Sequence, residues 1–324
     1  MPEVSGRKIS VGIGKETTRG TAVSPAFWLQ QDELSFQKRV KKEAHQGVIG
    51  VLDKQSFMDI VQEYADGAIG GNVLDRSFGL ILLATLGSIS TALKGGESVV
   101  YNHTITQNQS NTGQSLTIVR KDANGDLRYA LATAKSLEIK MEQGQYVKFT
   151  FETVSKKGAS ATSTVSYSAE NAFTSKHVTV KMASAVAGLG AATAIPVRSF
   201  TLKIDRDAEP YFVAGSNDVN EIISTGFQVS GEMVLRYTDT TYEALRDNDT
   251  DQAVSFTMAN TDVTIGTSSN PTIVLTLPKV TLSEWDLDQS RDNVTEQTIG
   301  LTGNYSIADT KQIDAVVTNT TASY

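Results

Sequence analysis

Apolar and polar residues alternate along much of the chain. The clearest alternating runs lie at 136–141, 177–182 and 199–205. A run of this kind buries one face of an extended strand and leaves the other face in water. A period of two in so many short segments is typical of antiparallel sheet, so the sequence predicts a mainly β protein. Asn124-Gly125 stands between two such runs and tolerates the positive φ of a tight turn, which predicts a hairpin there.

Two short segments break the alternation and have the composition of helices. The first, 75–86, is almost wholly apolar; Asp75 can cap its start and Gly87 can end it. The second, 239–246, has Asp239 or Thr240 as its cap. We expect a short helix in each place.

The two predicted helices lie in matching surroundings. Each follows a glycine-containing strand, and before that strand comes a long loop, predicted at 43–66 and at 207–225. A closing hairpin lies downstream of each helix. We interpret this order as an internal duplication of one β-rich unit that carries one helix. The alternative is one large β-domain with a loose loop in its middle.

The predicted boundary between the two copies is a small, polar and aperiodic segment at 155–164. We therefore expect a first unit at 1–157, a linker at 158–164 and a second unit at 165–324. Two copies are too few for a stacked array, so each unit should bury its own core.

Composition excludes several classes of protein. Of the 324 residues, 40% are hydrophobic and 20% charged, which is enough for a core and argues against general disorder. The net charge of −7 argues against a chain that holds nucleic acid, although like charge suits a surface past which nucleic acid slides. There is no cysteine, which excludes disulfides and thiolate metal sites. No signal peptide and no membrane span are evident.

The search for catalytic or metal-binding residues finds no convincing site. His45, His103 and His177 have neither metal-ligand nor helical spacing. The acidic segment 286–292 lacks the glycine and the glutamate of a calcium loop, and 247–251 is best interpreted as a solvated turn. The sequence therefore predicts no enzyme, no cofactor and no metal.

Three phrases of the sequence resemble the tail tube proteins of long-tailed bacteriophages, the siphophages. The first, at 12–25, reads Gly-Ile-Gly-Lys-Glu-Thr-Thr-Arg-Gly-Thr-Ala-Val-Ser-Pro. The second joins 199–206 to 222–226, and the third covers 229–237. The similarity extends over most of the chain, and the order of the phrases carries more weight than any single one.

This resemblance implies a fold of two tandem tail-tube units, each a β-sandwich or half-barrel with one short flanking α-helix. It also implies a structural virion protein that polymerises into stacked rings, forming the hollow tube through which DNA is ejected into the host. A duplicated chain implies a homotrimeric, pseudo-hexameric ring, with six chains as the alternative. Six units of four strands give ~24 strands and a backbone diameter of roughly 45–50 Å.

The resemblance also implies partners, a location and contact residues. The partners are further copies of the chain, the tail tape measure protein, and the tail terminator and distal tail proteins. Viral double-stranded DNA would pass through the lumen without specific binding, and no membrane is involved. The location is the phage tail in the virion, after assembly in the host cytoplasm. The long loops would contact the next ring, and the candidate residues are Gln46, Val48, Leu52, Phe57, Tyr211, Phe212, Asn217 and Ile222.

Two alternative functions stay open at this point. One is another β-protein of the virion or of a secretion apparatus, such as a tube, baseplate or head-decoration component. The other is a carbohydrate-binding adhesin, which would need a cluster of exposed aromatic residues with acidic partners. The sequence shows no such cluster. An unpaired sheet edge is a hazard for aggregation, and closing the sheets into a ring removes it, which favours the tube.

Overall fold

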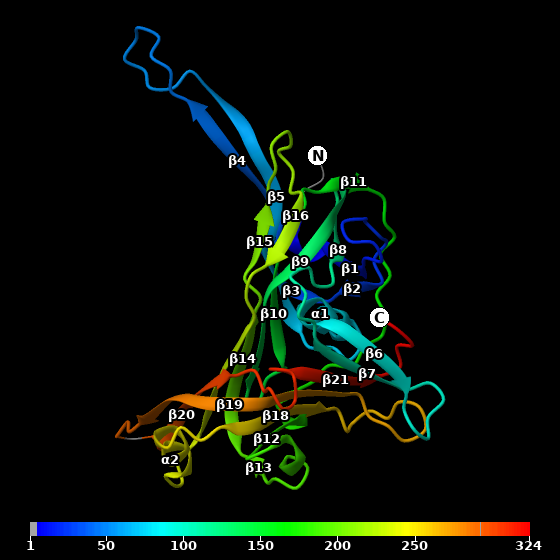
Figure 1. The fold of residues 1–324 in the computed structure, drawn as a ribbon. Coiled ribbons are helices and arrows are strands. Elements are labelled where there is room, and N and C mark those ends of the chain that lie inside the picture. The colour runs from blue at the N-terminus through cyan, green and yellow to red at the C-terminus, as the bar shows by residue number, and fades with distance from the viewer. Residues whose placement is uncertain (1–4, 292) are drawn as a thin grey trace.

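The computed structural model describes residues 5–291 and 293–324 (Figure 1). Strands dominate, and the described residues hold two α-helices, α1 (Ser77–Leu86) and α2 (Thr241–Asp247). Three short 3₁₀ turns lie at Gly6–Lys8, Ser175–His177 and Val186–Gly188. The predicted mainly β fold is confirmed. So is the hairpin at Asn124-Gly125, where Asp122 pairs with Gly125.

Eight successive strand positions form one continuous antiparallel sheet, which we call the long sheet. Its first edge consists of two consecutive strands that both pair with β5. In spatial order the strands are β3 (Gln31–Leu34) with β4 (Gln37–His45), β5 (Phe57–Asn72), β10 (Lys148–Ser155), β9 (Gly125–Glu142), β14 (Val197–Asp205), β17 (Gln228–Arg236), β20 (Glu296–Gly303) and β19 (Thr272–Asp288).

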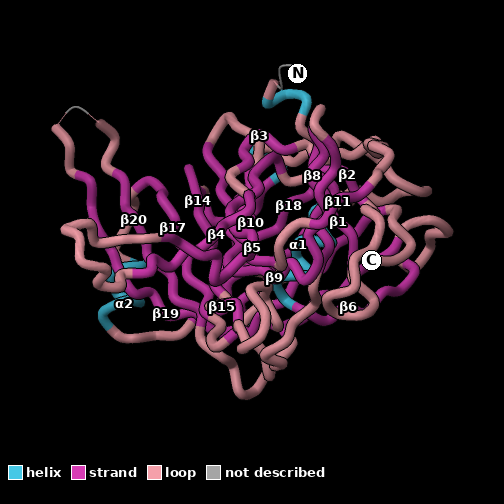
Figure 2. The backbone as a smooth tube through the Cα atoms, turned by 90° about the horizontal axis from the view of Figure 1, so that it is seen from above, coloured by secondary structure: helices cyan, strands magenta, loops and turns pink. Residues whose placement is uncertain are grey.

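Each half of the chain adds a second layer of strands. In the first half this layer is β2 (Phe27–Leu29), β1 (Ser10–Lys15), β8 (Leu116–Asp122), the first part of β9, and β11 (Ala159–Ala161). In the second half it is β13 (Ala194–Ile195), β12 (Val178–Ala183), β18 (Gln252–Ala259), the first part of β19, and β21 (Asp314–Asn319). Two strands of the first half, β7 (Tyr101–Gln107) and β6 (Gly87–Leu93), extend this second layer beyond β21. Figure 2 shows β1, β2 and β8 on one side of the molecule and β17, β19 and β20 on the other.

The strand order of the first half recurs in the second half. β4, β5, β10 and β9 lie side by side in the first half, and β14, β17, β20 and β19 follow the same order in the second. The helices also hold equivalent places along the chain: α1 lies between β5 and β9, and α2 lies between β17 and β19. This repeated order agrees with the duplication hypothesis, whereas the predicted unit limits at 157 and 165 stay a prediction.

The two halves are joined by backbone hydrogen bonds as well as by the connecting segment. At this seam, β9 pairs with β14 over seven residue pairs, from Glu142 with Ser199 to Ser136 with Asp205. In the second layer, β7 from the first half pairs with β21 from the second. A single apolar core, which includes Phe151, Leu202 and Phe256, extends through both halves, so the prediction that each unit buries its own core is wrong. The halves are therefore interlocked.

The first helix forms where the sequence predicts it, but Asp75 does not cap it. The carboxylate of Asp75 instead accepts hydrogen bonds from the backbone and side-chain amides of Asn171, at 2.9 and 2.8 Å. At the helix start, Glu170 accepts a hydrogen bond from the Ser77 hydroxyl at 2.6 Å. Gly87 ends the helix with φ of 104°. Every residue of α1 is buried, which explains why its sequence has no polar face.

The second helix also forms where predicted, one to two residues further along. The cap position is Thr240, whose side chain makes no cap hydrogen bond, while Asp239 accepts a hydrogen bond from the backbone N–H of Thr241 at 2.9 Å. No residue of α2 is fully buried, but Tyr242 and Leu245 pack on the core. The guanidinium carbon of Arg246 lies 5.4 Å from the ring centre of Trp285 on β19, so this helix packs against β19.

The predicted long loop at 43–66 is wrong over most of its length, because β4 and β5 continue through it as a paired hairpin. We call this hairpin and its loop, 37–66, the arm; it projects away from the body of the molecule (Figure 1). Only 46–56 lies outside the strands. All β4 residues except Ala44 are exposed, so neither face is buried and no alternating pattern marks the strand.

The second predicted loop, at 207–225, also contains a hairpin. β15 (Ala208–Tyr211) pairs with β16 (Glu221–Ser224), and we call this the short hairpin. Unlike the arm, it packs on its own chain. Ile222 and Val219 contact Leu131 of β9 and Val154 of β10 in a small apolar cluster.

A cluster of ion pairs around the buried Glu63 fixes the base of the arm to the body. The carboxylate of Glu63 on β5 accepts a hydrogen bond from Lys157 at 2.8 Å and pairs with Lys38 of β4. It also accepts one from the side chain of Asn217 in the short hairpin at 3.0 Å. The hydrogen bonds from Lys157 and Lys38 lower the pKa of Glu63 to about 2. Glu63 therefore ties the arm to both halves of the chain.

Leu202→Ala should destabilise the whole chain. Leu202 is fully buried and lies opposite Ile139 across the seam, and the cavity left by the truncation costs about 2–5 kcal/mol. Because the sheet and core are continuous, urea unfolding should give one transition with a lowered midpoint. Thr201→Ala, on the polar face of the same strand, should change stability by less than about 0.5 kcal/mol. Two separate transitions, with only one affected, would contradict this interlocked fold.

Protonating Glu63 should loosen the base of the arm. Its folded pKa of about 2 lies below the ordinary 4.5, so its ion pairs stabilise the fold above about pH 4.5 and are lost as the pH falls towards 2. We expect Glu63→Gln to lower the urea midpoint at about pH 6, and the difference from the wild type to narrow below about pH 4.5. The exposed Glu43→Gln serves as control and should have no effect. A difference that stays constant across this range would count against the ion pairs.

Candidate assembly interface

Two strand edges of the long sheet lack a partner strand among residues 5–291 and 293–324. β3 and β4 pair only with β5, and β19 beyond Thr281 pairs only with β20. These edges lie at opposite ends of the long sheet. Unpaired backbone N–H and C=O groups on an exposed strand are ready to pair with another chain. A contact between two different edges is head-to-tail, and repeating it closes a ring when the rotation permits.

The same two kinds of edge already meet inside the chain. β9, the last strand of the first set of four, pairs at the seam with β14, the first strand of the second set. By the repeated order, β19 is the equivalent of β9, and β3 with β4 is the equivalent of β14. The two unpaired edges therefore correspond to the two strands, β9 and β14, that pair at the seam.

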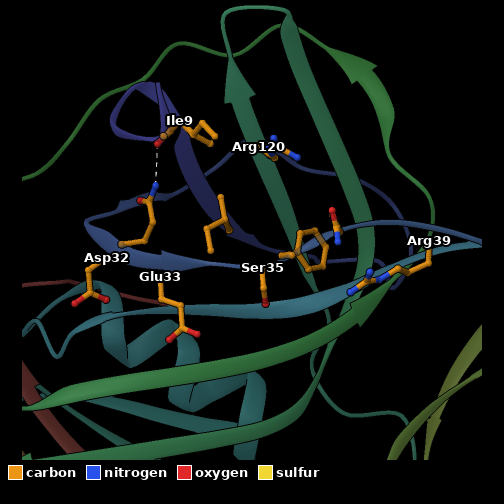
Figure 3. Close-up of a pocket in the computed structure, with 11 residues that line it drawn as sticks. Ile9, Asp32, Glu33, Ser35, Arg39 and Arg120 are labelled. Carbon is orange, nitrogen blue, oxygen red and sulfur yellow. Dashed lines mark hydrogen bonds between the residues drawn. The ribbon is translucent and has the colours of Figure 1, made fainter. Parts of the chain in front are cut away.

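The edge at β3 opens onto a polar cavity of about 490 Å³ (Figure 3). Figure 3 shows Asp32 and Glu33 at one end and Arg39 and Arg120 further along, with the Gln31 amide donating to the Ile9 carbonyl at 2.8 Å. This cavity contains charged groups of both signs and no histidine. It is a polar hollow beside a strand edge, suited to receiving another backbone.

The three histidines lie in separate environments. His45 stacks on Phe57 in the arm, with ring centres 4.6 Å apart. His103 is fully buried, its pKa is lowered by burial, and its ring contacts Asn319 at 3.2 Å. His177 contacts Asp262 at 3.1 Å. Within the described residues, no group of three or more His, Asp and Glu side chains is placed to hold a metal ion.

One face of the long sheet is polar because its strands alternate. On β9, Leu137 and Ile139 face the core while Glu138 and Lys140 face away from it, and the other strands follow the same rule. Acidic side chains outnumber basic ones on this polar face. Outside the arm, the acidic ones are Glu33, Glu138, Glu142, Glu152, Asp205, Glu232, Glu284, Asp286, Asp288 and Glu296, and the basic ones are Lys140, Lys148, Lys203 and Arg236.

The lysines of the polar face are paired with carboxylates. Lys140 contacts Glu142 at 2.8 Å, and Lys203 contacts Asp205 at 3.0 Å. The hydrogen bond to Glu142 raises the pKa of Lys140, and that to Asp205 raises the pKa of Lys203. Lys148 contacts Asp32 at 2.8 Å. Lys140, Lys148 and Lys203 are thus already matched by anions. Arg236 forms no ion pair within the described residues, and carboxylates stay in excess on the part of this face outside the arm.

The arm carries a concentration of exposed apolar side chains. Val48 is 97% exposed and Leu52 is completely exposed. The whole set is Val40, Val48, Ile49, Val51, Leu52, Phe57, Met58, Ile60 and Val61. A group of exposed apolar residues on one projection is typical of a protein contact. The four arm residues predicted as contacts, Gln46, Val48, Leu52 and Phe57, are all exposed at its outer end.

The four candidates in the second half differ from those in the arm. Tyr211 is 56% exposed at the end of β15. Phe212 packs edge-on against Tyr64 with ring centres 6.2 Å apart, and Asn217 binds Glu63. Ile222 is fully buried in the cluster beneath the short hairpin. The eight candidates therefore do not form one surface, and contact with another ring stays a prediction.

Sequence reasoning missed several exposed apolar residues that extend these surfaces. Ile49, Val51 and Ile60 enlarge the arm surface, and their only signal is that apolar residues adjoin the predicted contacts Val48 and Leu52 or Val61. Outside the arm, Ile307 is 87% exposed in the turn after β20, and Tyr305 beside it is 47% exposed. No alternating pattern marks this turn, because it is too short to show a period.

Comparison with known proteins identifies the family. The family model described as "Phage tail tube protein" matches residues 6–303. No curated protein matches the chain. Within the described residues, no helix has both the length and the apolar character needed to cross a membrane. Because the family model covers nearly the whole of this β-rich chain, the resemblance seen in the sequence is confirmed, and the chain belongs to the phage tail tube protein family.

Proposed function

We propose that copies of this chain pair edge to edge into closed rings, which stack to form the wall of a siphophage tail tube. Membership of the family makes the chain a structural tail tube protein, a component of the phage tail. The observation that carries the finer proposal is the pair of open edges at opposite ends of the long sheet. They are equivalent to the two strands that join at the seam, so the chain contains one example of the contact it would make with the next copy.

Three chains fit one ring better than six. Each long sheet contributes eight strand positions, so three chains give ~24 strands and a backbone diameter of roughly 45–50 Å. This leaves a lumen wide enough for duplex DNA after side chains are added. Two fused units per chain, with limits near 157 and 165, would make such a trimer pseudo-hexameric. Six chains would double the strand count and the diameter.

The polar face of the long sheet would line the lumen. Its excess of carboxylates repels phosphates, and its lysines are held by neighbouring acids such as Glu142 and Asp205. DNA would therefore pass during ejection into the host without specific binding. This role requires neither catalysis nor a cofactor.

The arm would connect one ring to the next. Its apolar end, which includes Val48, Leu52 and Phe57, is exposed in the single chain and would be buried against another ring. The tube would also meet the tail tape measure, tail terminator and distal tail proteins, with assembly in the host cytoplasm.

Introduced cysteines can test the edge contact. At the seam, Lys203 lies opposite Glu138. In the repeated strand order, Glu33 holds the place of Lys203 and Thr281 that of Glu138. We therefore expect Glu33 of one chain to lie opposite Thr281 of the next. Paired positions on neighbouring strands are close enough for a disulfide, and the chain has no cysteine of its own.

Assembled Glu33→Cys/Thr281→Cys chains should form covalent dimers and trimers on oxidation. Electron microscopy should show hollow tubes before oxidation, and denaturing gels should show no species larger than three chains. The single variants and a mismatched pair, Glu33→Cys/Glu232→Cys, should stay uncross-linked between chains. Tubes that yield no cross-linked chains would refute the edge contact, and a ladder reaching six chains would refute the trimer.

Removing the apolar character of the arm should stop the rings from stacking. Val48→Asp/Leu52→Asp places two charges where burial is expected, at a cost of several kcal/mol per contact. Electron microscopy should then show free rings or short stacks. Val99→Asp, at a 51% exposed residue in the β6–β7 connection, should leave tube length unchanged. Tubes of normal length from the double variant would contradict the role of the arm.

A further inference from the structure

The seam includes a second contact besides the paired strands. In the first half, the segment 108–115 connects β7 to β8 and lies where β14 turns into the short hairpin. The backbone N–H of Ser224 donates to the carbonyl of Asn111 at 2.9 Å. The guanidinium of Arg206 lies against Gly113, so closely that an added Cβ there would be 2.7 Å from Nη1. The segment before β8 therefore packs against the bend at the end of β14.

The corresponding segment in the second half has no such contact in the described chain. It runs from the end of α2 to β18, the equivalent of β8, and we call Asp247 to Asp251 the acidic turn. It lies beside the open edge of β19, because Asp251 accepts a hydrogen bond from Thr281 at 2.8 Å and contacts Lys279 at 3.1 Å. Asp247, Asp249 and Asp251 are all exposed.

The equivalent of the β14 bend is the passage from β3 into β4, at the base of the arm. β4 carries four exposed cations, Lys38, Arg39, Lys41 and Lys42. Lys38 and Arg39 pair with Glu63 and Asp66 of their own chain. Lys41 and Lys42 form no ion pair within the described part of the chain. A strand with two unmatched cations, Lys41 and Lys42, thus occupies the position that the acidic turn of a neighbour would reach.

We propose that the acidic turn of one copy binds the basic strand β4 of the next copy in the same ring. This inference rests on the proposed ring and adds a lateral role for the base of the arm, distinct from the stacking role of its end. The seam supplies the geometry, and the opposite charges of the two segments supply an independent reason for the match. Since the chains each carry a net charge of −7 and repel one another, a local attraction of this kind orients their approach.

The contact should depend on salt and on charge sign. Exposed ion pairs are screened within about 8–10 Å at ionic strengths near 0.1–0.15 M, so the attraction acts mainly on the rate of association. We expect Lys41→Glu/Lys42→Glu to slow tube assembly at low salt about ten-fold or more, as followed by light scattering. Added salt should shrink this difference. The urea midpoint of the monomer should not change, because neither lysine is buried.

A charge swap provides the decisive variant. Asp247→Lys/Asp249→Asn should slow assembly in the same way; asparagine suits the positive φ of 48° at 249. Combining both double changes sets the lysine introduced at 247 against the glutamates introduced on β4 and should recover part of the wild-type rate. Lys94→Glu/Lys181→Glu changes the net charge of the chain equally, away from the arm and from both open edges of the long sheet, and should have a much smaller effect.

Wild-type assembly rates for Lys41→Glu/Lys42→Glu at low salt, or no recovery in the swapped chain, would overturn this contact. Either result leaves the ring itself intact if the wild type still forms tubes and the Glu33–Thr281 cross-link. Absence of wild-type tubes and of that cross-link would instead count against the proposed function. Binding of duplex DNA to the wild-type monomer, abolished by Lys41→Glu/Lys42→Glu, would assign β4 to nucleic acid and overturn the inference.

Discussion

Backbone hydrogen bonding between β9 and β14 is the interaction on which the rest of the structure depends. It joins two sets of four strands into one sheet and removes one edge from each set. A strand edge that stays unpaired exposes donors and acceptors that invite further pairing. What remains is one open edge at β3 and β4 and another at β19. The two open edges of the long sheet thus differ from each other, and the β19 edge of one copy can pair with the β3 and β4 edge of the next.

The same constraint sorts the side chains by face. Alternation puts Leu137, Ile139 and Leu202 into a core shared by both halves and leaves charged residues on the opposite side. The core fixes the sheet, so the polar face keeps its carboxylates and their lysine partners in a set arrangement. Glu63 extends this order to the arm, because it ties β5 to Lys157 and to the short hairpin.

The sequence predicts those parts of the fold in which local pattern and burial agree. The strands at 136–141 and 199–205 and both short helices form as expected, since each has a one-sided or uniformly apolar sequence. The arm was predicted as a loop because neither of its faces is buried. The sequence predicts Asp75 as a helix cap, but its carboxylate instead accepts hydrogen bonds from Asn171, which is distant in sequence. Pairings such as β7 with β21 depend on long-range register, which local pattern does not encode. In the candidate interface, the loop residue Val48 is exposed and Ile222 is buried, and the sequence does not distinguish the two.

Helical reconstruction of assembled tubes by electron cryomicroscopy tests the central claim most directly. The account predicts three chains per ring, with β19 of each chain hydrogen-bonded to β3 of the next in the manner of β9 with β14, and the polar face turned to the lumen. Rings of six chains, or tubes in which β3 and β19 have no strand neighbour from another chain, would contradict it.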